Sequence, residues 1–175
     1  MKKNVLYPVI FLLVPILLAG MAYAALQPPA IIASAADSES LRESESQARR
    51  LEGTWRMQVT IRNCETGDPL RDFPAYLSFA QGGTLTETTT GFSPSLRSPG
   101  HGIWQRSGGH NYSAVTEAFL FNPAGQWVGG QKLTMAITVV AADQIDVTAT
   151  NQLFDTDGNL TLSGCATAVG QRMKN

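Results

Sequence analysis

Two glutamates lie in stretches where apolar and polar residues alternate, and each shares its side of the stretch with apolar residues. Glu87 alternates with Leu85, and Glu117 alternates with Val115 and Phe119. If these are the inward sides of strands, both carboxylates point into the core. Burial and mutual repulsion would then raise their pKa values toward the range useful for general acid–base catalysis. Glu87 and Glu117 are therefore candidate catalytic residues. The alternative is that each faces outward after a bulge.

A second concentration of functional side chains lies between Ser98 and Ala114, in the segment SPGHGIWQRSGGHNYSA. Its aromatic and basic groups flank two glycine-rich turns, and ligand sites often lie on such loops at a barrel mouth. Arg106 shares a side with Trp104 and could neutralise one of the carboxylates. The candidate ligand-binding residues are Trp104, Arg106, His110, Tyr112, Phe119 and Met135. A solvent-exposed turn without function is the alternative interpretation.

The sequence offers no residue pattern for a metal site, for a bound cofactor or for nucleic-acid binding. His101 and His110 lack zinc-type spacing and are too few to hold a metal ion alone. Glu117 could complete such a site, but we expect no metal. The chain has no G-x-S-x-G, no phosphate-cradling loop and no H-E-x-x-H, and we expect no cofactor. The net charge of −1, with 15% charged residues, gives no basic excess that would bind nucleic acid.

The first 50 residues differ in composition from the rest. Residues 1–24 resemble a signal peptide, with two early lysines, an apolar core and a small-x-small site that predicts cleavage after Ala24. The alternative is an uncleaved membrane anchor. Residues 25–50 predict a spacer followed by a short helix. We therefore expect export to the periplasm or the medium, and no membrane contact beyond the signal segment.

Export changes the interpretation of the two cysteines. Two cysteines in an oxidising compartment are most simply one disulfide, here between Cys64 and Cys165. Their alpha carbons must then lie within about 7 Å of each other.

From residue 51 to residue 175 the hydrophobic pattern has a period of two. Trp55, Met57, Val59 and Ile61 share one side of the first run, and glycine-containing turns separate the later runs. Eight such runs with short connections predict an all-β domain, an eight-stranded antiparallel up-and-down barrel. A two-sheet sandwich is the alternative.

The cysteines favour the barrel, because they lie at the end of the first run and within the last. A disulfide between them makes the first and last strands neighbours, which closes the sheet. If Cys64 lies opposite Cys165 in an antiparallel pair, Trp55 comes alongside the end of the last strand, near Arg172. Both cysteines then lie on the polar side, while Trp55 and Arg172 face the interior.

The expected interior is mostly apolar, and several positions carry small side chains. Gly164, Ala166, Ala168 and Ala149 leave room that larger residues would fill, which indicates either a cavity or a tapering barrel.

The segment Gly53-Thr54-Trp55, with Arg172 near the end of the last run, resembles the calycin signature of lipocalins and related small-ligand barrels. The resemblance implies that Trp55 plugs the closed end and that Arg172 lies across its indole in a cation–π contact. Both are then structural residues. AADQID does not match the family's second, T-D-Y-like motif, and the chain also resembles allene-oxide-cyclase-like barrels.

These features lead to one main expectation about function and two alternatives. The main expectation is a barrel that binds a small apolar or amphipathic molecule. The first alternative, implied by the second resemblance, is a cofactor-independent isomerase or cyclase. The second alternative is a packed barrel that serves as an interaction module at the envelope.

Overall fold

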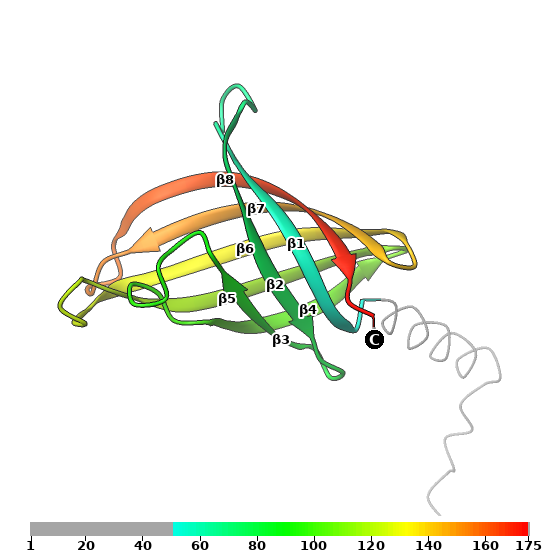
Figure 1. Ribbon diagram of the computed structural model, residues 1–175, viewed down its shortest axis with the longest axis horizontal. Coiled ribbons are helices and arrows are strands. Elements are labelled where there is room, and N and C mark those ends of the chain that lie inside the picture. The colour runs from blue at the N-terminus through cyan, green and yellow to red at the C-terminus, as the bar shows by residue number, and fades with distance from the viewer. Residues whose placement is uncertain (1–50, 175) are drawn as a thin grey trace, which may run out of the picture. The chain divides into compact units, whose positions relative to one another are not determined.

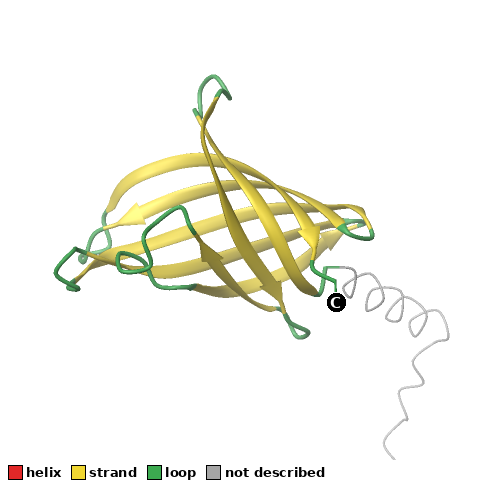
Figure 2. Ribbon diagram, viewed as in Figure 1, coloured by secondary structure: helices red, strands yellow, loops and turns green. Residues whose placement is uncertain are grey.

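The computed structural model describes residues 51–174, all of them in strands and their connections (Figures 1 and 2). The expected signal peptide, spacer and short helix lie outside the described residues. Within residues 51–174, no helix is long and apolar enough to cross a bilayer. The strands are β1 (Gly53–Arg62), β2 (Pro69–Phe79), β3 (Thr84–Thr89), β4 (Gly100–Gly108), β5 (Asn111–Phe121), β6 (Trp127–Ala141), β7 (Gln144–Phe154) and β8 (Leu160–Arg172).

The eight strands form a closed barrel in which each strand pairs antiparallel with the next and β8 pairs with β1. The predicted up-and-down barrel is therefore confirmed, and the two-sheet sandwich is excluded. Tight turns make the meander possible. In the turn between β2 and β3, Gly82 and Gly83 have φ of 91° and 89°, a region that favours glycine. The β1–β2 hairpin projects beyond the barrel wall (Figure 1).

The fourth strand, β4, begins at Gly100, directly after an irregular connection. Residues 90–99 connect it to β3, and part of this connection also pairs with β5. Ser98 N donates to Phe119 O, and Phe121 N donates to Leu96 O. The connection therefore continues the wall of the barrel beside β5.

The disulfide links Cys64, just beyond the end of β1, to Cys165 in the middle of β8, with alpha carbons 5.3 Å apart. The register differs by two residues from the expected one, because Cys165 lies opposite Arg62 and Trp55 lies directly opposite Arg172. Cys64 sits just beyond the end of β1 and reaches back to its partner. A shift of two residues keeps every side chain on the expected face of the sheet.

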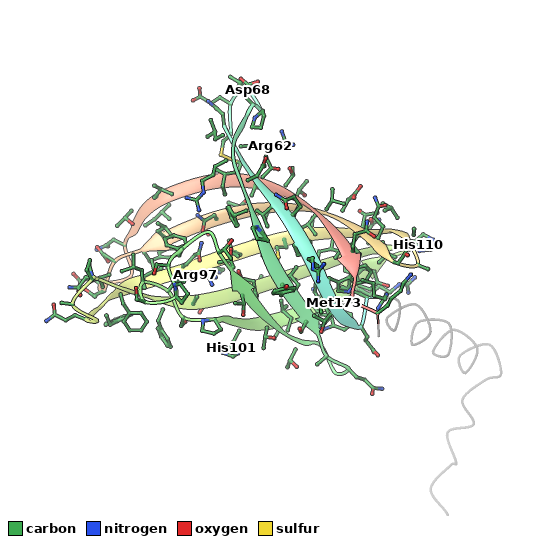
Figure 3. All side chains as sticks on the ribbon, in the orientation of Figure 1. Arg62, Asp68, Arg97, His101, His110 and Met173 are labelled. Carbon is green, nitrogen blue, oxygen red and sulfur yellow. A yellow bond between two sulfur atoms is a disulfide. The ribbon has the colours of Figure 1, made fainter. Side chains whose placement is uncertain are left out.

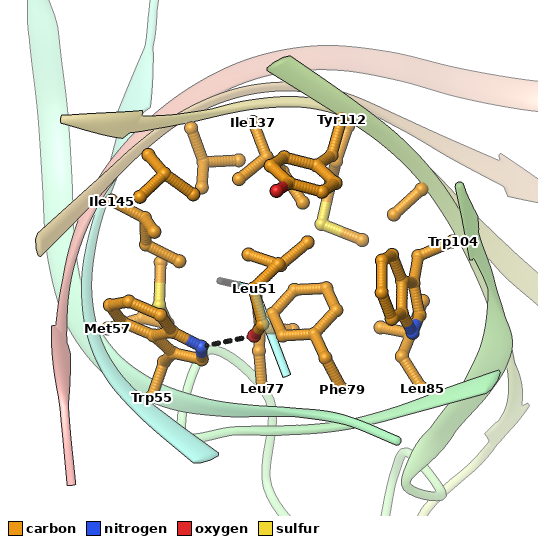
Figure 4. Packing of buried hydrophobic residues seen from close by; sticks show 14 of the residues in the cluster. Leu51, Trp55, Met57, Leu77, Phe79, Leu85, Trp104, Tyr112, Ile137 and Ile145 are labelled. Carbon is orange, nitrogen blue, oxygen red and sulfur yellow. Dashed lines mark hydrogen bonds between the residues drawn. The ribbon is translucent and has the colours of Figure 1, made fainter. Parts of the chain in front are cut away.

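One end of the barrel is closed by packed side chains (Figure 4). Leu51 lies in the centre of this end, and its carbonyl oxygen accepts a hydrogen bond of 2.9 Å from Trp55 Nε1. Around it, the rings of Phe79 and Trp104 meet edge to face at 5.9 Å, and Tyr112 is tilted against Trp104 at the same distance. We call this the closed end; it is built from the start of β1, β5 and β7 and the end of β2, β4 and β6.

Arg172 covers Trp55 from the last strand. Its guanidinium carbon is 4.1 Å from the centre of the indole, within cation–π range. Its Nη1 also donates to Glu52 O, and its Nε donates to Ala142 O at 3.0 Å. Arg172 therefore ties β8 to the segment before β1 and to the β6–β7 turn.

Candidate functional site

The barrel contains a cavity of about 360 Å³ on the side of the lumen away from the closed end. Its wall is mostly apolar. The apolar lining residues are Met57, Val59, Ile61, Phe73, Ala75, Leu77, Phe92, Leu133, Met135, Val147, Ala149, Leu153, Leu162, Ala166 and Ala168. The small residues of β7 and β8 lie beside the space, in agreement with the room that the sequence indicates there.

The cavity reaches the surface at the end of the barrel opposite the closed end, and we call this opening the mouth. Leu162 lines the cavity and is 50% exposed. Arg71 also lines it and is exposed, with its guanidinium 5.1 Å from the ring of Phe73. Arg71 Nη2 donates to Gly91 O at 2.5 Å, which holds the side chain at the edge of the mouth.

Four polar side chains form a chain of hydrogen bonds across one side of the lumen. Arg97 Nη2 donates to Glu87 Oε2 at 2.5 Å, and Arg97 Nε donates to Gln131 Oε1. Gln131 Nε2 in turn donates to Asn151 Oδ1 at 2.6 Å. The network joins β3, the β3–β4 connection, β6 and β7. Glu87, Gln131 and Asn151 line the cavity, so it presents polar groups to an otherwise apolar space.

Glu87 is only 4% exposed, and Arg97 is similarly buried. Burial raises the pKa of the Glu87 carboxyl above its usual range, and the charge and hydrogen bond of Arg97 oppose this shift. Glu87 Oε2 is bonded to Arg97, whereas Glu87 Oε1 accepts no hydrogen bond within residues 51–174. A carboxylate in this position can accept a hydrogen bond from a molecule in the cavity.

The expectation that Glu117 also points inward is wrong. Glu117 and Phe119 are exposed on the outer face of the barrel, and Phe119 is 63% exposed. On β5 the even-numbered residues face inward, and the small residues Ala114 and Ala118 are buried there, opposite Trp104 of β4 and Gln131 of β6 respectively. The apolar content of the odd positions therefore indicated the wrong face.

The cation that neutralises Glu87 is Arg97 and not Arg106. Arg106 lies near the β4–β5 turn, where its Nε donates to Gly109 O at 3.1 Å. Arg97 was absent from the candidates, because it belongs to an irregular connection whose side-chain direction has no period. The available signal was that Arg97 is the next cationic residue along the chain after Glu87.

The other expected ligand-binding residues divide between two places. Met135 is buried and lines the cavity. Trp104 and Tyr112 belong to the closed-end core, and His110 lies in the turn at that end. Figure 3 shows Arg97 and His110 toward opposite ends of the barrel. The segment from Ser98 to Ala114 therefore does not form the mouth, because β4 runs from the mouth side to the closed end.

The two histidines are far apart in the barrel. His101 is exposed on the outer face of β4 and pairs across the strands with Glu117. His110 lies at the far end of the β4–β5 hairpin. Within residues 51–174, no group of three His, Cys, Asp or Glu side chains is arranged to hold a metal ion.

The comparisons with known proteins add a structural neighbour to this geometry. No family model matches the chain. No curated protein matches its sequence. Among solved structures, the chain is similar to Rv2717c from M. tuberculosis, with a TM-score of 0.38 and 15% sequence identity. That alignment covers 75% of this chain and 98% of Rv2717c.

Proposed function

We propose that this chain is an exported, lipocalin-like barrel that binds one small apolar or amphipathic molecule in its interior. The observation that supports the proposal most strongly is the apolar cavity of about 360 Å³ that reaches the surface beside Arg71 and Leu162. Ligand pockets are typically about 300–1,000 Å³ in volume and mostly apolar with a few polar groups. Eight-stranded barrels have an interior of the size that holds one small ligand.

The disulfide supports the exported location. Disulfides persist in oxidising compartments such as the periplasm and the extracellular space. The composition of residues 1–24 agrees with such a route. A packed barrel acting only through its outer surface receives less support, since it requires a filled interior.

A fluorescent apolar probe tests the proposal. We expect the full chain to bind N-phenyl-1-naphthylamine with a rise in fluorescence, and a small-to-large change at Ala149 to block it. Ala149 lines the cavity on β7, so Ala149→Phe should weaken binding by at least about tenfold. Ala136→Phe is the matched control, because Ala136 is exposed on the neighbouring strand. Equal binding by both variants, each folded by circular dichroism, would contradict the proposal.

Native mass spectrometry of the protein purified gently from its own host addresses the natural ligand. A mass excess that disappears on denaturation would support the proposal and deliver the ligand for identification.

One observation favours a second candidate function, a cofactor-independent isomerase or cyclase. Glu87 is a buried carboxylate with a raised pKa on the wall of an apolar cavity, which suits proton transfer. With Glu117 on the outer face, Glu87 is the carboxylate that this candidate needs. If the recovered ligand is a substrate, wild type should convert it to an isomer of equal mass, separable by chromatography. Glu87→Gln should bind it without converting it.

A further inference from the structure

The cavity wall contains two polar groups that the hydrogen-bond network leaves available. Glu87 uses Oε2 for Arg97, and its Oε1 accepts no hydrogen bond from residues 51–174. Asn151 uses Oδ1 to accept from Gln131, and its Nδ2 donates to no group in the same residues. Both residues line the cavity, on either side of Gln131 in the network.

Such groups need a hydrogen-bond partner in the cavity, either water or a ligand. Each nitrogen of the Arg97 guanidinium donates one hydrogen bond, to Gln131, to the carbonyl oxygen of Ser98 and to Glu87. The network therefore holds the Glu87 carboxylate and the Asn151 amide in fixed positions and leaves one acceptor and one donor for an occupant of the cavity.

The chemistry of these two groups selects among occupants. A carboxylate only accepts hydrogen bonds, so the group next to Glu87 must donate, and an amide nitrogen only donates. A ligand carboxylate or ether cannot donate to Glu87, and a ligand carboxylate would also meet a like charge. A ligand ammonium could donate, but Arg97 already neutralises Glu87. A hydroxyl group is uncharged and both donates and accepts.

We infer that the cavity binds an apolar alcohol whose hydroxyl group donates to Glu87 Oε1, with Asn151 Nδ2 as the donor available to an oxygen of the same ligand. This inference rests on the proposed function, because it requires a ligand inside the barrel. It adds the chemical class of the ligand and the residue that recognises it.

The test compares two ligands that differ only in the donor. Displacement of N-phenyl-1-naphthylamine from the full chain at pH 8 would be measured with 1-decanol and with 1-methoxynonane, which has the same number of heavy atoms but no O–H. A hydrogen bond to a charged group corresponds to about a tenfold preference or more, so the alcohol should displace the probe at a correspondingly lower concentration.

Variants assign the preference to Glu87. Glu87→Gln replaces the free oxygen with a donor or removes its charge, and we expect the two ligands to bind within about twofold of each other. Glu117→Gln makes the same chemical change on the outer face and should keep the wild-type preference. If Glu87→Gln does not fold with Arg97 left uncompensated, Glu87→Gln/Arg97→Gln replaces the buried ion pair with a neutral pair.

The outcomes separate the inference from the proposed function. Probe binding with equal affinity for alcohol and ether in wild type would overturn the inference and leave the proposed function standing. A preference that persists in the folded Glu87 variants would overturn the assignment to Glu87. Failure of the probe and of both alkyl ligands to bind would overturn the proposed function itself.

Discussion

Glu87 and Arg97 form an ion pair whose side chains are 4% and 3% exposed. Lys174 and Asp143 also pair, at 2.8 Å, but their side chains are 68% and 46% exposed. Breaking a buried pair by removing one partner typically costs about 3–5 kcal/mol, whereas an exposed pair contributes little, because water screens it. The buried pair therefore constrains the part of the lumen where the cavity has its polar wall.

The raised pKa of Glu87 makes stability depend on pH. The folded protein holds the Glu87 proton more tightly than the unfolded chain, where the pKa is near 4.5. This stabilising contribution is complete below that value and is lost as the pH rises through the folded pKa. Urea unfolding between pH 4 and pH 8 should show the free energy of unfolding of wild type falling relative to that of Glu87→Gln. A constant difference between wild type and Glu87→Gln over this pH range would contradict the prediction.

Two cations near the end of the chain should differ in their effect on stability. Arg172 packs on the buried Trp55 ring and donates to two backbone carbonyls, so Arg172→Ala should lower the free energy of unfolding by about 1–2 kcal/mol. Lys174→Ala should have no measurable effect, because its ion pair is exposed. Equal urea midpoints for the two variants would show that the contact over Trp55 contributes nothing.

At the scale of elements, β4 carries two glycines on the side that faces the interior. A Cβ on Gly100 would lie 2.5 Å from Glu87 Oε2, and a Cβ on Gly102 would lie 1.8 Å from Val115 O. The first glycine makes room for the Glu87 carboxylate beside Arg97. The second allows β4 to approach the backbone of β5 closely. The lack of a side chain at these two glycines therefore helps β4 to position the polar network.

Gly102→Ala should disrupt this approach. The added methyl group would meet backbone atoms that cannot move without separating β4 from β5, so we expect a loss of about 3 kcal/mol or more in the free energy of unfolding. Gly164→Ala is the control, since nothing lies within 4 Å of its Cβ position, and its effect should be within about 0.5 kcal/mol. Thermal or urea unfolding measures both. Similar losses for the two variants would contradict the close contact.

At the scale of the whole molecule, the pairing of β1 with β8 closes the sheet, and packed side chains fill one end of the barrel. The β1–β8 ladder extends from Trp55 opposite Arg172 to Arg62 opposite Cys165. The disulfide from Cys64 to Cys165 fastens the two strands where this ladder ends. The closed end is packed around Leu51, whereas the cavity occupies the lumen toward the mouth. The barrel therefore combines a filled end with a hollow end.

Removal of the disulfide should weaken the barrel and leave its topology intact, because the β1–β8 hydrogen bonds remain. The cysteines are 101 residues apart, and a cross-link over such a loop contributes about 2–5 kcal/mol, mainly by restricting the unfolded chain. Cys64→Ser/Cys165→Ser should show this loss in urea unfolding with unchanged far-ultraviolet circular dichroism. Reduced wild type should match the double variant; an unchanged midpoint in both would contradict the prediction.

The sequence alone determined the number and order of strands, their faces on β1 and β8, and the disulfide that closes the sheet. Alternation with a period of two is a local property that can be recognised in the sequence. A disulfide between Cys64 and Cys165 requires the first and last strands to be neighbours. The sequence also indicated that Glu87 faces inward, because Glu87 alternates with the buried Leu85 on β3.

Only the tertiary structure decided which end is hollow and which groups meet inside it. Glu117 lies outside even though its side of β5 is apolar, because the inward side of that strand is the one opposite Trp104 and Gln131. Arg97 comes from a connection without period, and its approach to Glu87 exists only once β3, β5 and β6 are assembled. Side chains distant in sequence meet in the lumen through the register and closure of the whole barrel, which no local pattern encodes.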